Sequence, residues 1–513
     1  MPLMETSARV GILLVAYVFL ERGLRQTSHL SARAYAEPVL LVGLVQRLSE
    51  NLLPVLLFGV LIITRFHALV RAWRDFEHGA ELRALIALLI GIYAWTFGAY
   101  DYNFYFGQTH GLDRVLLIVC AGLTLWRPIF VLPFLAFTFA LIWQFDYPLA
   151  WQFSWTEIDL PLRALVLFGA AFLVNTATRE RRTDTFLFLL LCLVASAYWS
   201  PGIGKIELDW LTHPYLYFLL PAGYAHGWLG FLDANSIVAL TQWLAPFTVP
   251  MMLFTLVVEL GALVALWRPN ITLWWLIACV GLHVGILLVC GIAFWKWILL
   301  QVGLMLIWRN HRTAGHLPIY SRTQFLLSLV LIGGSSIWFR PVPLAWYDTP
   351  VTRTLRLEAV GASGTTYVLP SQLFSQYADL LTFSNFGWLD PARHIPNQIW
   401  GVTMDREIAR ALVDVKSFEQ FDAFESERGH SEFDANRAEL FDEFLRQFIG
   451  KRALHAPAVS VQAPGHLWVW ARPPVYAAQE PIQRIQVYQL TWLYHDGAID
   501  SRRRLIREIA IAK

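Results

Sequence analysis

Charged residues are scarce in this chain. They make up only 15% of its 513 residues, whereas 56% are hydrophobic and 15% are aromatic. Soluble globular domains carry about 25% charged residues, so the composition excludes a chain that is soluble as a whole. The formal net charge is only +2 and there is no long basic run. This argues against a nucleic-acid partner, because phosphates require a concentrated Lys/Arg surface. The composition instead predicts a lipid bilayer as the partner.

Cysteine and lysine are also rare. The four cysteines all lie in apolar stretches, where a small buried side chain is expected rather than a disulfide or a zinc site; they are Cys120, Cys192, Cys279 and Cys290. Five lysines stand against 35 arginines, and only Lys205 and Lys296 precede residue 340. An amine can lose a proton, whereas a guanidinium cannot. These two lysines therefore merit attention, although chance retention is the simpler explanation.

The sequence motifs of the common catalytic classes are missing. The chain contains no G-x-x-x-x-G-K-[ST], no G-x-S-x-G, no H-E-x-x-H and no C-x-x-C-H, and its cysteines and histidines lack zinc spacing. Any chemistry is therefore expected to use lysine, histidine and carboxylates, and no metal is predicted.

Charge density divides the chain in two. Residues 1–339 hold 21 Lys+Arg and 18 Asp+Glu, whereas the last 174 residues hold 19 and 20. The fold class is predicted to be mainly α: a polytopic transmembrane bundle over 51–339, with a smaller soluble α+β domain over 340–513. Residues 1–50 are expected to form short or interfacial helices over 10–20 and 38–48. About 9–10 spans of near-membrane length are expected, at roughly 52–70, 82–99, 114–126, 128–144, 161–175, 185–199, 249–267, 271–290, 292–308 and 324–339.

Arginine-rich connections alternate with acidic, aromatic ones. By the positive-inside rule the arginine-rich side is cytoplasmic, which places residues 340–513 outside the cytoplasm of a bacterial inner membrane. Gly361 and Gly364 favour one hairpin turn in this domain, and the stretch 495–497 (HDG) favours another. Apolar spacing predicts helices over 404–417 and 432–449.

The segment that begins at Ser200 joins a span to the outward side. Its Pro201, Gly202 and Gly204 favour a tight loop that holds Lys205 near the membrane boundary. Partial burial there would lower the pKa of the Lys205 amine and make it a base. The alternative is a charged lysine that snorkels to the interface, or that pairs with Glu207 or Asp209.

Two ionisable residues lie in the middle of predicted spans. Glu259 and His283 are expected to face the interior of the bundle, where they could hydrogen-bond across adjacent helices in a proton path or a polar cavity. A simple interhelical contact is the alternative. His110 lies in an outward turn on the side of Lys205. Lys296, between two tryptophans, is predicted to be an interfacial anchor.

The stretch 202–210 (GIGKIELDW) resembles the segment around the catalytic lysine of vitamin K-dependent gamma-carboxylase, A-G-x-K-K-L-D-x-D-W. Lys205 aligns with the second lysine of that pattern, and Gly204 replaces the first. The Glu259 and His283 spans are similar to the HTTM bundle that this family shares with many bacterial proteins. The resemblance covers roughly residues 50–340 and implies catalytic roles for Lys205 and His110. It also implies cofactor-binding roles for His283, Glu259 and Trp210.

The implied reaction depends on a reduced naphthoquinone of the vitamin K or menaquinol type. Neutral Lys205 would remove a hydroxyl proton from this quinol. Oxygen would then convert the quinol anion into a strong base. That base would take the γ-proton of a glutamate in a protein or peptide, and carbon dioxide would then add to the glutamate. Such a base needs a dry pocket. Aromatic residues in 101–106 and 144–155 could line its mouth, although membrane-interface belts have the same composition. Two other functions remain open: a proton-coupled transporter or channel that uses Glu259 and His283, and a non-catalytic maturation or scaffold protein.

Overall fold

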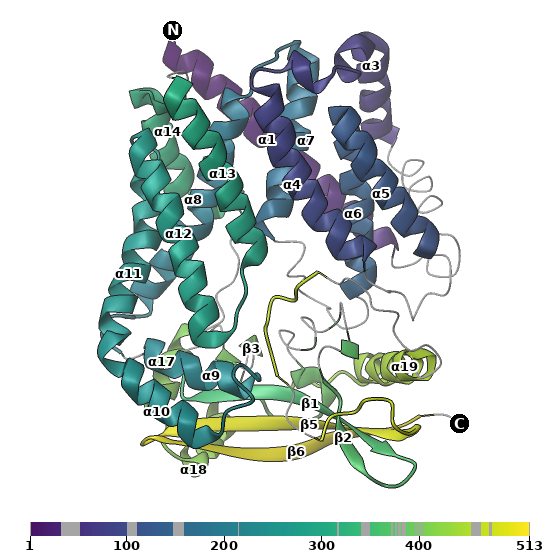
Figure 1. The fold of residues 1–513 in the computed structure, drawn as a ribbon, viewed down its shortest axis with the longest axis vertical. Coiled ribbons are helices and arrows are strands. Elements are labelled where there is room, and N and C mark those ends of the chain that lie inside the picture. The colour runs from purple at the N-terminus through teal and green to yellow at the C-terminus, as the bar shows by residue number, and fades with distance from the viewer. Residues whose placement is uncertain are drawn as a thin grey trace.

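Every apolar stretch that the sequence predicts to be a span contains a helix in the computed structural model of the chain. The structure describes residues 2–31, 52–99, 110–146, 159–213, 215–314, 318–339, 349–370, 373–374, 377, 381, 386–395, 398–399, 402–403, 405–452, 463–470 and 474–511. Figure 1 shows a bundle of long helices that rests on one end against a sheet, with the N-terminus at the far end of the bundle and the C-terminus beside the sheet.

The bundle is built from apolar helices. Its main helices are α1 (Pro2–Ser31), α3 (Leu52–Leu69), α4 (Gly79–Gly98), α5 (His110–Trp126), α6 (Val131–Asp146), α7 (Leu160–Thr178), α8 (Asp184–Glu207), α11 (Thr248–Gly261), α12 (Pro269–Cys290), α13 (Trp295–Ala314) and α14 (Arg322–Gly333). Within the described residues, five helical stretches are long and apolar enough to cross a membrane: Gly79–Gly98, Leu160–Thr178, Asp184–Glu207, Ala234–Val264 and Pro269–Cys290. Several of the other predicted spans are shorter apolar helices.

The N-terminal helix differs from its prediction. We expected a short or interfacial helix over 10–20, but α1 runs for 30 residues and packs mainly against α6 and α7. Its Tyr17 is fully buried. The crossing is close because Gly169 of α7 has no side chain: a Cβ there would lie 3.1 Å from Leu135 and 3.2 Å from Leu20. Helix α1 is therefore an integral part of the bundle. The predicted amphipathic piece over 38–48 lies outside the described residues.

The C-terminal part is an α+β unit, as predicted. Its sheet is antiparallel, in the order β2-β1-β5-β6, and consists of β1 (Val351–Gly361), β2 (Thr366–Val368), β5 (Ile482–His495) and β6 (Ala498–Ala510). Both predicted hairpins are confirmed. Gly364 and Gly497 adopt positive φ angles of 83° and 75° in the two turns, a conformation that glycine reaches without steric cost.

Three helices accompany this sheet: α17 (Arg406–Leu412), α18 (Phe418–Arg428) and α19 (Ala435–Arg452). Helix α17 falls within the predicted range 404–417, and α19 overlaps the predicted range 432–449 but continues to Arg452, whereas α18 was not predicted. On α19, the residues Phe441, Phe444, Leu445 and Phe448 are buried in one apolar cluster with Leu357, Ile485 and Val487 of the sheet. The helical spacing of these aromatic residues therefore marks the face that covers the sheet.

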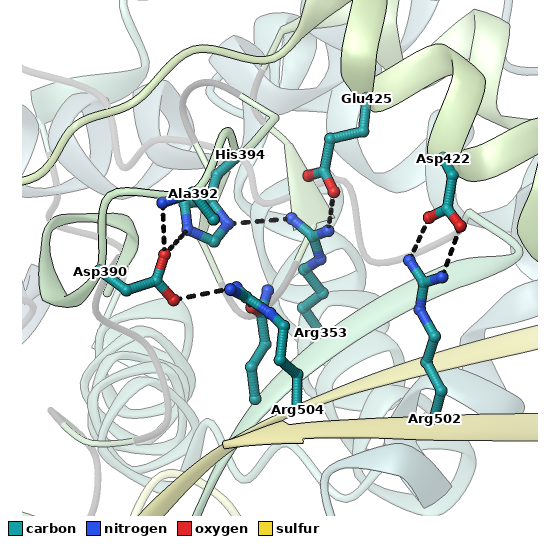
Figure 2. Close-up of polar contacts among 9 residues, drawn as sticks. Arg353, Asp390, Ala392, His394, Asp422, Glu425, Arg502 and Arg504 are labelled. Carbon is teal, nitrogen blue, oxygen red and sulfur yellow. Dashed lines mark hydrogen bonds and ion pairs between the residues drawn. The ribbon is translucent and has the colours of Figure 1, made fainter. Parts of the chain in front are cut away.

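Charged side chains fasten α18 and the stretch 390–394 to the sheet (Figure 2). Arg353 of β1 donates to Glu425 of α18 and, over 3.3 Å, to Nδ1 of His394. Because Nδ1 accepts, the ring hydrogen of His394 is on Nε2, which donates to Asp390 over 3.1 Å. Burial opposes ionisation of Asp390, but hydrogen bonds from His394 and the Ala392 N–H, with the nearby Arg504, hold its pKa below the usual value. These contacts pair Arg353 and Arg504 of the sheet with Glu425 of α18 and with Asp390.

Three helices and one extended segment connect the bundle to the sheet. In Figure 1, α9 (Leu219–Ala225) and α17 lie between them, and α10 (Ala234–Leu244) contacts β6. Gly223 of α9 lies against α12, where a Cβ would be 2.8 Å from the Cα of Cys290. Residues 463–470, which we call the strap, return from the C-terminal domain to the bundle: the N–H of Ala293 donates to His466 and that of Trp468 donates to Gly291.

Candidate functional site

Lys205 lies on a helix rather than in the predicted loop. Helix α8 continues through Pro201, Gly202 and Gly204 and ends two residues after Lys205. A proline within a helix removes one backbone hydrogen bond, but the packing of α11 outweighs this loss. A Cβ at Gly202 would lie 3.0 Å from the Cβ of Glu259, so glycine allows the two helices to approach closely. Gly202, which favours a loop in the sequence, instead allows α8 to pack closely against Glu259 of α11.

The Lys205 amine pairs with that carboxylate. Its Nζ lies 2.7 Å from Oε1 and 3.0 Å from Oε2 of Glu259, and only 12% and 8% of the two side chains are exposed. The amine also lies 5.4 Å from the ring centre of Trp210. Three of the residues predicted for the site are thus brought together. A pair this buried is strongly bound only because each charge offsets the desolvation of the other.

The acidic neighbours of Lys205 in sequence have other partners. Glu207 forms an ion pair with Arg406 of α17, and Asp209 pairs with Arg410 over 2.9 Å. Asp209 has a positive φ of 58°, which turns the chain sharply where α8 ends. The predicted alternative, a Lys205 that pairs with Glu207 or Asp209, is therefore wrong. These carboxylates attach the C-terminal domain to the end of α8 and leave Lys205 to Glu259.

A second polar cluster lies on α8 two turns before Lys205. The hydroxyl of Tyr198 lies 2.5 Å from Nε2 of His283, and Gln301 of α13 donates to the same hydroxyl. His283 is 4% exposed and Gln301 is fully buried. The sequence suggested that Glu259 and His283 could hydrogen-bond across adjacent helices, but in this structure His283 contacts Tyr198 and Glu259 pairs with Lys205. Sequence reasoning missed Tyr198 and Gln301, although the seven-residue spacing from Tyr198 to Lys205 would have signalled one helix face.

This cluster contains two polar atoms without protein partners. Among the residues that the structure describes, Nδ1 of His283 and Oε1 of Gln301 make no hydrogen bond. Gln301 donates to Tyr198; if the hydroxyl then donates to Nε2 of His283, Nδ1 carries the ring hydrogen. One buried donor and one buried acceptor are then unsatisfied, which is costly in an apolar interior. A hydroxyl group, which both donates and accepts hydrogen bonds, could satisfy these two atoms, whereas a carbonyl could satisfy only Nδ1–H.

Aromatic rings surround the same histidine. The ring centres of Phe294 and Trp297 lie 4.5 Å and 5.6 Å from that of His283, and Tyr198 packs edge-on against Trp275 at 5.4 Å. Flat, apolar walls with few polar groups are typical of sites for planar organic molecules. His283 and Gln301 therefore combine unsatisfied polar atoms with aromatic neighbours, a composition that suits a planar ligand with polar groups.

Lys296 is held in a pair of its own. Its Nζ lies 3.1 Å from Asp159, whose other carboxylate oxygen accepts a 3.0 Å hydrogen bond from the indole of Trp297. The amine also lies 5.5 Å from the ring centre of Tyr93. The role of Lys296 as an interfacial anchor stays a prediction. Its surroundings make Lys296 a close match for Lys205: each is a partly buried lysine with one carboxylate partner and an aromatic neighbour.

The strap closes the bundle beside this aromatic cluster. The ring of His466 packs edge-on against Phe294 at 4.7 Å between centres, and the indole of Trp295 donates to the carbonyl of Pro464. Burial, with a contribution from the positive charge of Lys296, lowers the pKa of His466 to about 3. His466 was not predicted, because nothing in the sequence near 466 indicates that this segment returns to the bundle.

Replacing His466 by Gln is expected to flatten the dependence of stability on pH. The folded pKa of about 3 lies below the value of about 6.5 for an unfolded histidine. The folded state favours the neutral form of His466. The contribution of neutral His466 to the free energy of unfolding is therefore complete above pH 6.5 and is lost as the pH falls towards 3. At pH 5 the loss specific to the wild-type protein amounts to about 2 kcal/mol. Unfolding in detergent between pH 4 and 8 measures it, and parallel curves for the two proteins would contradict it.

The remaining predicted site residue cannot be placed. His110 is the first residue of α5, but its side chain lies outside the described part of the chain, as do residues 101–106 and 147–155 of the predicted mouth. Comparisons of the chain with protein-family models, curated proteins and solved structures find no match. Lys205, Glu259, Trp210 and the cluster around His283 are therefore the described residues of the candidate site.

Proposed function

We propose that the chain is an integral membrane enzyme that uses Lys205 as a base towards a reduced naphthoquinone, as in the carboxylase family that its lysine segment resembles. The observation that carries this proposal is the buried pair of Lys205 and Glu259, on the same helix face as the unsatisfied cluster around His283. Lys296 also pairs with a carboxylate beside aromatic rings, so the resemblance of the segment 202–210 is what singles out Lys205.

The pair provides a route to a free amine. When the shared proton moves along the 2.7 Å hydrogen bond from Nζ to Glu259, the ion pair becomes a neutral amine and a neutral carboxylic acid. A poorly solvated site narrows the free-energy gap between these two arrangements, because it penalises both charges. The amine then accepts the hydroxyl proton of the substrate and becomes an ammonium again. Glu259 thus stores the proton that the base gives up.

A reduced naphthoquinone would supply an acidic hydroxyl and, with oxygen, the driving force for the carboxylation of glutamate. Tyr198 and Gln301 would hold His283 in one orientation, with Nδ1 left for a contact to a bound ligand. The rings of Phe294, Trp297 and Trp275 exclude water, as strongly basic chemistry requires. The C-terminal domain, attached through α17 and the strap, is where a protein or peptide substrate would bind.

The test uses the full chain in vesicles with reduced menadione, radiolabelled bicarbonate and a glutamate-rich peptide. We expect menadiol oxidation above that of protein-free vesicles and label in the peptide. Menadiol oxidation without label in the peptide would support Lys205 as a base but contradict the carboxylation of glutamate. If neither occurs, the enzyme proposal fails.

A second candidate is proton-coupled transport. The observation that favours it is the succession of buried polar groups along α8, from the Gln301–Tyr198–His283 cluster to the Lys205–Glu259 pair, since ionisable groups inside a bundle often mark proton paths. The same vesicles, loaded with a pH-sensitive dye and given a pH gradient, distinguish the two. Transport predicts protein-dependent proton flux without menadiol, whereas the enzyme predicts none.

A further inference from the structure

A cavity lies between the end of α9 and the sheet, in a part of the protein that the proposed reaction does not use. Its volume is about 150 Å³. One side consists of Thr354 to Leu357 of β1 with Leu490 and Trp492 of β5, and the other of Ala225 to Gly227 with Val469 and Trp470 of the strap. A cavity of about 150 Å³ is enough to hold a molecule of the size of benzene.

The lining is mainly apolar, but it contains one arginine. Arg356 forms an ion pair with Glu358, whose Oε1 lies 2.8 Å from Nε, although Nε makes no hydrogen bond among the described residues; Glu358 is only 2% exposed. The two terminal nitrogens of a guanidinium form a fork that matches a carboxylate in geometry. The Arg356 side chain is 30% exposed, so an anion that enters from solvent reaches it without unfolding the sheet.

The cavity lies beside an exposed aromatic surface. Trp470 lines the cavity and is 41% exposed, and Phe231, which is 65% exposed, packs edge-on against it at 5.3 Å between ring centres. An apolar chain that leaves the cavity would therefore continue over aromatic rings rather than into water. The geometry thus combines a site for one negative charge, a small apolar chamber and an apolar exit.

We propose that this cavity binds an amphipathic monocarboxylate of the fatty-acid class, with its carboxylate on Arg356 and its first carbons against Leu490, Trp492 and Trp470. A carboxylate on an acidic peptide would offer the same charge, but its polar backbone matches neither the apolar chamber nor the aromatic exit. The proposal is independent of Lys205, so either can fail without the other.

Hexanoate is the probe, because it fits the chamber and partitions weakly into membranes. Calorimetric titration of the full chain in nanodiscs is expected to give a Kd on the order of 1 mM, with hexanol at least about 10-fold weaker because it lacks the charge. Arg356→Gln is expected to remove the preference for hexanoate, and Arg356→Lys to retain part of it. Arg484→Gln is the matched control, since Arg484 also pairs with a glutamate on this sheet, Glu508, but does not line the cavity.

The proposal is overturned if hexanol binds wild-type protein as tightly as hexanoate, if no binding of hexanoate is detected, or if Arg356→Gln keeps the preference. Tighter binding of a glutamate dipeptide than of hexanoate would also overturn it in favour of a peptide site. If Arg356→Gln unfolds, Val368→Phe decides instead: it fills the apolar end of the cavity from a partly exposed position and is expected to abolish binding of both probes. Undiminished hexanoate binding by that variant contradicts the proposal.

Discussion

Lys205→Arg is expected to lower menadiol oxidation by about 100-fold or more, within the range that a positioned acid or base contributes. Arginine retains the positive charge and can still pair with Glu259, but a guanidinium does not give up its proton at neutral pH. The substitution therefore removes the base while it preserves the electrostatics of the pair. Initial rates in vesicles, normalised to folded protein, measure the effect.

Lys296→Arg is the control for this experiment. Lys296 has a carboxylate partner at 3.1 Å and an exposed side-chain fraction of 19%, against 12% for Lys205. The loss of a lysine from a similar environment should leave the rate within about threefold of wild type. Equal rates for wild type and Lys205→Arg would remove the lysine base from the account. Equal losses in both variants would show that the rate follows structure rather than chemistry.

Glu259→Leu is expected to destabilise the protein by about 3 kcal/mol, because it leaves the buried ammonium of Lys205 without its partner. Adding Lys205→Met removes that ammonium as well. The double variant should therefore recover to within about 1 kcal/mol of wild type, since apolar residues often replace a buried ion pair without loss. Thermal unfolding in detergent, followed by the loss of helical circular dichroism, compares the three proteins.

The difference in stability between the single and double variants tests whether the two side chains interact. Recovery in the double variant shows that the two side chains act on each other, as the 2.7 Å contact implies. A double variant as unstable as Glu259→Leu would instead indicate that Glu259 stabilises the bundle through other groups, and the proposed proton exchange would lose its partner.

Helix positions in the bundle were predictable because they depend on local composition. Stretches such as 271–290 are apolar over a membrane thickness, and α12 occupies Pro269–Cys290. The hairpin at 495–497 was predictable for a similar reason, because glycine after aspartate favours the turn. The continuation of α8 through Lys205 was not predictable, since Pro201 and Gly202 break helices in isolation but not against a closely packed neighbour such as α11.

The contacts between the site residues were less predictable than the identity of these residues. Lys205, Glu259 and Trp210 were all chosen from the sequence, and they meet. Their pairing depends on the direction in which each helix presents its side chains and on contacts between residues 54 positions apart, which an apolar run does not encode. Uniformly apolar helices show no preferred face. The same reason explains why Tyr198 and Gln301 were missed, and why the return of the strap to Phe294 was not foreseen.

The most direct test of the account is menadiol oxidation by the double variant Lys205→Met, Glu259→Leu after its stability has been measured. We predict that this variant unfolds near the wild-type temperature but oxidises menadiol no faster than protein-free vesicles. A stable double variant that oxidises menadiol at the wild-type rate would contradict the account, because the reaction would then proceed without the amine and without the carboxylate that holds it.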